Sequence, residues 1–152
     1  MHRPARRIGF AGTFLLFTVV ASQAQWVMVA RAASGRIQQM EQRSADGKGG
    51  YDVATVVIEA NAQKVYETAV LRLTAHAEAV KVIEQNPKRR MVAFTNGMQT
   101  ASLQANPLGD KLTQLVVAST LDSAQSSTTS VVVKSIQNVC NELKVTCTLE
   151  TD

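Results

Sequence analysis

The stretch that most constrains the fold of this 152-residue chain runs from residue 78 to residue 120, where short β-prone runs alternate with turn signals. Asn96-Gly97 favours a tight hairpin, because both central residues of a type I′ turn need positive φ. Asn86-Pro87 and the segment 106–110 ("NPLGD") indicate two further turns. These signals predict an antiparallel meander of four strands, at residues 78–85, 89–95, 98–105 and 111–120.

We expect one amphipathic helix before this meander in the sequence and a second one after it. Asn61 is a suitable N-cap for a helix that ends near His76. Its apolar residues recur at helical spacing on one face, at Ala62, Val65, Tyr66, Ala69, Val70 and Leu73. A second helix is predicted from Thr128, capped by Ser127 or Thr128, although the valines at 131–133 would also fit a strand. Its apolar face comprises Val132, Ile136, Val139, Cys140 and Leu143.

Two further segments complete the predicted order of elements. The run 52–60 is rich in β-branched residues and predicts a first strand, and residues 144–150 predict either an extended tail or a sixth strand. The order is therefore β-α-β-β-β-β-α with a tail. Each helix has one apolar face that needs burial, so we expect an α+β fold. This would be a two-layer sandwich with an antiparallel sheet of about five strands and both helices on one face.

The N-terminus has the layout of a secretory signal peptide. Arginines precede an apolar run, 8–21, and Ser22-Gln23-Ala24 places small residues where a signal peptidase cleaves. We predict a signal peptide at 1–24, with cleavage after Ala32 as an alternative, and a periplasmic protein. Apolar character nearly continues to Ala30, so an uncleaved segment that anchors the domain to the inner membrane is a second alternative.

The segment that follows the signal is polar and ends in glycines. Residues 33–50 are therefore interpreted as a flexible linker, and residues 51–152 as a single α+β domain. The whole chain has 16 Lys and Arg against 12 Asp and Glu, and loss of 1–24 would leave 13 against 12. A near-neutral domain has no electrostatic footprint for nucleic acid. No nucleic-acid partner is expected, and membrane contact is expected only if the N-terminal helix is retained.

Both cysteines lie close together, in "NVCNELKVTC". In an exported protein, disulfides form and persist, and a chain reversal around residues 142–144 would bring Cys140 to Cys147. We expect a structural disulfide between them. Free or intermolecular thiols and a metal or redox role remain alternatives, although the spacing is not Cys-x-x-Cys and two cysteines do not complete a zinc site.

The inventory of reactive residues argues against an enzyme. His76 is placed near a helix C-terminus, where a favourable charge–dipole interaction and solvation account for it, and proximity to Glu78 does not make a triad. The sequence contains no nucleophile-elbow motif, no Gly-rich phosphate loop and no cluster with metal-ligand spacing. We therefore expect no catalytic residues, no metal and no cofactor.

Several segments resemble a class of small secreted bacterial envelope domains without assigned function, many of them lipoproteins. The likeness rests on "VIEANAQKVYETAVLRL", the Asn-Gly hairpin and "PLGDKLTQLVVAST". It implies the β-α-β-β-β-β-α layout over residues 52–140, but this chain has no lipid-acceptor cysteine before the domain. A looser resemblance to helix-grip (START-like) domains implies a curved antiparallel sheet that cradles a long C-terminal helix.

Two functions follow as expectations. The first is a non-enzymatic binding module that meets an envelope protein through its exposed sheet face or sheet edge. The alternative is a carrier of a small apolar ligand in a pocket between the sheet and the C-terminal helix. That pocket would be lined by Tyr66, Val70, Phe94, Leu103, Val132 and Ile136.

Overall fold

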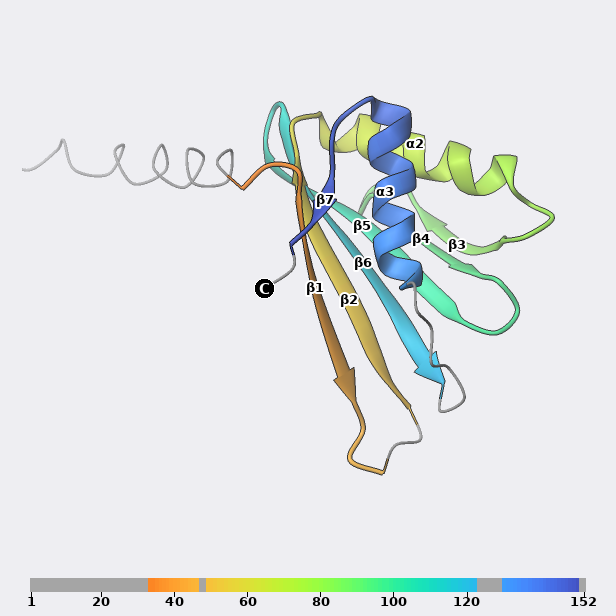
Figure 1. Ribbon diagram of the computed structural model, residues 1–152. Helices are drawn as coiled ribbons and strands as arrows, with labels where there is room; N and C mark the ends of the chain where they lie inside the picture. The colour runs from red at the N-terminus through yellow and green to blue at the C-terminus, as the bar shows by residue number, and fades with distance from the viewer. Residues whose placement is uncertain (1–32, 47–48, 123–129, 151–152) are drawn as a thin grey trace, which may run out of the picture.

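The structure is a computed structural model that describes residues 33–46, 49–122 and 130–150. It contains a seven-stranded sheet in the order β3-β4-β5-β6-β2-β1-β7 (Figure 1). All neighbours are antiparallel except β1 and β7, which are parallel. The strands are β1 (Arg36–Arg43), β2 (Gly49–Ile58), β3 (Lys81–Asn86), β4 (Met91–Thr95), β5 (Thr100–Gly109), β6 (Leu112–Asp122) and β7 (Thr148–Leu149).

Two helices lie on one face of this sheet. Helix α2 (Ala62–Ala75) contacts β3 to β6, whereas α3 (Val131–Leu143) crosses β1, β2 and β6 (Figure 1). The side chain of Asn61 accepts hydrogen bonds from the N–H groups at the start of α2, as its N-cap position predicts. Ser130 caps α3, and the caps expected at Ser127 or Thr128 lie outside the described residues.

One apolar core fills the space between the sheet and the helices. The helix faces predicted from their spacing contribute to it, together with alternate residues of the strands. Its largest fully buried side chains are Ile37, Ile58, Leu103, Leu115, Ile136, Val56, Val65, Val92, Val117 and Val132. The α+β prediction is confirmed, but the predicted number of about five strands is wrong.

The main error concerns the segment predicted to be a linker. Residues 36–43 form β1, which pairs with β2 in the register Gln38 to Thr55 and Arg43 to Gly50. The strand was missed because β1 lies near the sheet edge and its residues after Ile37 are exposed, so no period-2 apolar pattern marks it. Ile37 is the one residue of β1 that is buried in the core, with 0% of its surface exposed.

Gly50 of this segment also has a structural role. A Cβ atom at Gly50 would collide with the backbone of Gln42 and Arg43 in the neighbouring strand. The sequence pattern that indicated flexibility therefore reflects a close approach of two strands. The seventh strand, β7, has only two residues, and it extends the same edge by parallel pairing of Arg36 with Thr148.

The β4–β5 hairpin is present, but its turn is not the predicted type I′. β4 ends at Thr95 and β5 begins at Thr100, and within this loop only Gly97 has positive φ, at 90°. The Asn96 side chain organises the turn instead, because its Oδ1 accepts from the N–H groups of Met98 (3.0 Å) and Gln99 (2.8 Å).

The assignment of β1 to the core gives a stability prediction. Replacing Ile37→Ala leaves a cavity at a fully buried position, so the free energy of unfolding should fall by about 3 kcal/mol. Met40→Ala is the matched control, because 73% of the Met40 surface is exposed on the same strand. Urea denaturation followed by circular dichroism measures both variants. If the two variants are equally stable, β1 is not part of the folded core.

Candidate functional site

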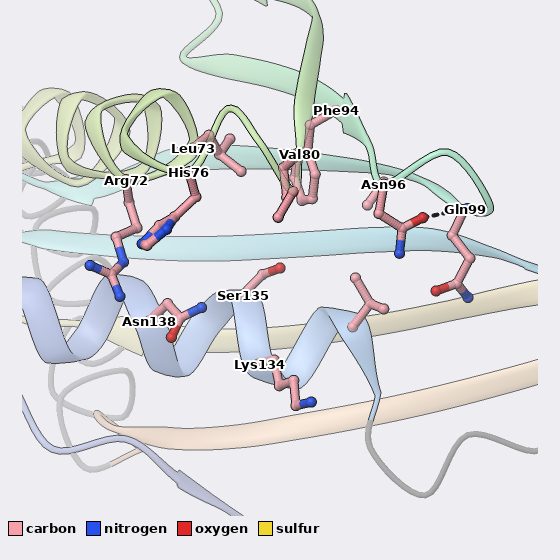
Figure 2. Close-up of a pocket in the computed structure, with 13 residues that line it drawn as sticks. Arg72, Leu73, His76, Val80, Phe94, Asn96, Gln99, Lys134, Ser135 and Asn138 are labelled. Carbon is pink, nitrogen blue, oxygen red and sulfur yellow. Dashed lines mark hydrogen bonds between the residues drawn. The ribbon is translucent and has the colours of Figure 1, made fainter.

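A cavity of about 390 Å³ opens between α2, the β4–β5 hairpin and α3. Its apolar lining consists of Leu73, Ala79, Val80, Phe94, Ala101 and Val131. Its polar lining consists of Arg72, His76, Asn96, Gln99, Lys134, Ser135 and Asn138. Apolar side chains from α2 and the strands form one wall, and the polar residues of α3 form the opposite wall (Figure 2).

The end of α2 shapes one side of this cavity. Helix α2 stops at Ala75, and the N–H of its C-cap His76 donates to the carbonyl of Leu73 (3.3 Å). The N–H groups of Ala79 and Val80 both donate to the carbonyl of His76 (3.0 Å each), so the chain turns back towards β3. This turn brings Val80 beside Leu73 and leaves the His76 side chain at the cavity.

One end of the cavity carries basic side chains. We call it the basic end, and it is lined by Arg72, His76 and Asn138. Figure 2 shows Arg72 and His76 directed from α2 towards α3, where Asn138 lies. Arg72 Nη1 donates to Glu142 Oε1 on α3 (2.8 Å), which links the two helices. His76 Nδ1 lies 3.5 Å from Glu78 Oε1. Arg72 Nε is buried and has no hydrogen-bond partner among the described residues.

The opposite end of the cavity is formed by the hairpin loop. Gln99 is buried, and its Nε2 donates to the carbonyl of Thr120 (3.3 Å). Asn96 Oδ1 is occupied by the two N–H groups of its own turn. One side-chain atom of each residue, Asn96 Oδ1 and Gln99 Nε2, is thus engaged in holding the hairpin.

The residues expected to line a pocket divide between the cavity and the core. Phe94 lines the cavity, and Phe94 and Leu103 together line a small adjoining recess of about 40 Å³. The other expected residues pack elsewhere between sheet and helices: Tyr66, Val132 and Ile136 are buried in the core, and Val70 is partly buried against it.

The polar lining was missed by the sequence analysis. Lys134, Ser135 and Asn138 recur at helical spacing beside the apolar face of α3, which places them along one side of that helix. Arg72 and His76 are four residues apart at the end of α2. This spacing was a usable signal, but only the tertiary structure brings the two helix faces together.

The two cysteines close the C-terminal end of the domain. Cys140 Sγ is bonded to Cys147 Sγ, and their Cα atoms are 6.1 Å apart. Lys144 adopts a left-handed conformation (φ 58°) at the C-cap of α3, which reverses the chain between them. Beyond this reversal the N–H of Thr148 donates to the carbonyl of Gly35 (2.8 Å), so the disulfide holds β7 beside β1.

A buried carboxylate supports the start of α3. Asp52 on β2 is 4% exposed and accepts hydrogen bonds from Ser130 Oγ and from Gln39 Nε2 (2.9 Å). Ser130 Oγ in turn accepts from the N–H of Val133 (3.4 Å). This chain of contacts fixes the N-terminus of α3 to β2, and its negative charge lies at the positive end of the helix dipole.

In the described part of the chain, no group of three or more His, Cys, Asp or Glu residues is placed to hold a metal ion. Within the same residues, no helix is long and apolar enough to cross a membrane.

No family model matches the chain, and no curated protein matches it by sequence. Among solved structures it is similar to the conserved protein of unknown function EF2215 from Enterococcus faecalis (10% identity, 81% of each chain covered, TM-score 0.49). It is also similar to the Zhui aromatase/cyclase from Streptomyces sp. R1128 (15% identity, 63% of this chain and 85% of that chain, TM-score 0.40). A third is Ara h 8.0201 (6% identity, 63% and 95% covered, TM-score 0.40). These likenesses transfer no activity or ligand to this chain.

The disulfide should stabilise the domain measurably. It joins residues seven apart in sequence, and a short closed loop removes enough unfolded-state entropy for about 2 kcal/mol. The urea midpoint of the oxidised protein should exceed that of the dithiothreitol-reduced protein, and Cys147→Ser should match the reduced form. If all three unfold at the same urea concentration, the bridge does not stabilise β7.

Proposed function

We propose that this domain binds a small, largely apolar molecule in the cavity between its sheet and α3 and carries it without chemical change. The cavity itself is the observation that carries the proposal. Its volume of about 390 Å³ is within the range of small-molecule sites, which are mainly apolar with a few placed polar groups. The apolar residues Leu73, Val80, Phe94 and Val131 fit the body of such a ligand.

The lining chemistry favours binding over catalysis. Among the described lining residues there is no carboxylate and no cysteine, and the carboxylate beside the lining residue His76 is that of Glu78, which lies outside the lining. A hydrolytic site would require a nucleophile and a base within hydrogen-bonding reach. Ser135 lines the cavity, but no hydrogen bond joins it to His76 among the described residues.

We also propose that the domain works in an oxidising compartment, the periplasm. The disulfide between Cys140 and Cys147 supports this location, because such bonds persist mainly in exported proteins. The predicted signal at 1–24 would deliver the chain there, and contact with the inner membrane would follow only from an uncleaved signal.

A second candidate function uses the sheet face opposite the helices. Met40 and Tyr51 are exposed there (73% and 63%), and the half-buried Val53 lies between the neighbouring Met40 and Ala118 in the strand register. Exposed apolar side chains on an open sheet face favour a protein partner from the envelope. We rank this function second because it rests on exposed side chains alone, whereas the first function rests on a cavity.

Ligand capture can be tested with phenylnaphthylamine, a neutral apolar dye whose fluorescence rises in an apolar site. We expect saturable binding, and we expect Ser135→Phe to weaken it about tenfold by filling the cavity. Asn141→Phe is the matched control, since it places the same ring on an exposed position of α3 outside the cavity. Equal dye affinity in the two variants would contradict binding at this site.

A further inference from the structure

We infer that the ligand is an amphipathic anion, namely a carboxylate on an apolar chain or ring, with its carboxylate at the basic end. This inference rests on the proposed function and adds the charge and the orientation of the ligand. The apolar body would lie on Leu73, Val80 and Phe94 and extend towards the hairpin loop.

The charges around the cavity have one sign. The lining contains the side chains of Arg72 and Lys134 and the imidazole of His76. No acidic side chain is among the described lining residues. Two carboxylates outside the lining, Glu142 and Glu78, contact Arg72 and His76, and all four side chains are partly exposed. Water screens both ion pairs, so the carboxylates offset the basic groups of the lining only in part.

Arg72 offers an unused hydrogen-bond donor at the basic end. Its Nη1 is held by Glu142, whereas its Nε is buried without an acceptor. A buried donor that lacks a partner is unfavourable, and native proteins rarely leave one. A ligand carboxylate would supply that acceptor once the guanidinium turns about its Glu142 contact. The planar group would then present two parallel N–H donors to the two carboxylate oxygens.

The helix end at this site does not forbid an anion. The C-terminus of α2 carries partial negative charge on its carbonyls. Two carbonyls at this end are already paired: that of Leu73 accepts from the N–H of His76, and that of His76 accepts from the N–H groups of Ala79 and Val80. The guanidinium of Arg72 in the cavity lining offsets the rest of the partial charge.

The opposite end of the cavity is unsuitable for an anion. Asn96 Oδ1 is held by its own turn, and Gln99 Nε2 donates to the carbonyl of Thr120, so neither atom attracts an anion. The N-terminus of α3 already has a carboxylate, because Asp52 is bonded to the capping Ser130. A second anion there would be repelled by Asp52, which leaves the basic end as the site of the carboxylate.

A matched pair of ligands separates charge from apolar contact. Decanoate and decanol share an alkyl chain of equal length and differ in the head group, and displacement of bound phenylnaphthylamine measures both. Wild type should bind decanoate more tightly than decanol. Arg72→Gln should weaken decanoate about tenfold and leave decanol within about twofold, because only the anion uses the guanidinium.

Glu142→Gln is the control for the structural role of Arg72. It removes the same α2–α3 ion pair but keeps the cation, so decanoate affinity should stay unchanged or rise. If Glu142→Gln weakens decanoate as much as Arg72→Gln does, the helix bridge and not the charge is responsible, and the inference is overturned.

The remaining outcomes separate this inference from the proposed function. Equal binding of decanoate and decanol, with equal effects of Arg72→Gln on both, would overturn the anionic class while leaving an apolar carrier. Failure of decanoate to displace bound dye would also overturn it. Absence of dye binding itself would reject the proposed function and this inference with it.

Discussion

The burial of α3 against the sheet is the interaction on which the rest of the structure depends. Val132, Ile136 and Val139 on its apolar face are buried in the core, between the sheet and α2. Polar and covalent links then fix the helix at both ends. Asp52 holds its N-terminus through Ser130, and the disulfide at Cys140 holds the tail that follows it. The helix is thereby tied to β2 at its start and to the β1–β7 edge at its end.

The cavity is a consequence of this arrangement. Helix α3 crosses β1, β2 and β6, whereas α2 covers β3 to β6, and the two helices lie at an angle to each other (Figure 1). The cavity is lined by both helices and by residues of the β4–β5 hairpin. Arg72 and Glu142 bridge the helices at one side of that space. The same residues that hold the two helices together therefore place a cation beside an apolar wall, which is the basis for the proposed ligand class.

The sequence was informative wherever a segment is amphipathic over its whole length. The Asn61 cap, the apolar faces of α2 and α3 and the strand near 111–120 follow directly from local spacing. β1 was missed because a strand near the sheet edge with one buried residue shows no period-2 apolar pattern. The turn at Asn96 was misjudged because the side chain, and not positive φ, satisfies the backbone donors. The polar half of the cavity needs two helices brought together, which no local pattern encodes.

The most direct test of the binding site is to map a bound carboxylate on the isotope-labelled protein by nuclear magnetic resonance. Titration with decanoate should shift the backbone amides around the cavity, at Leu73, His76, Val80 and Ala101, in one saturable transition. It should leave the opposite sheet face, at Tyr51 and Val53, unchanged. Shifts confined to that sheet face would contradict a sheet–helix binding site and would favour the protein-docking function.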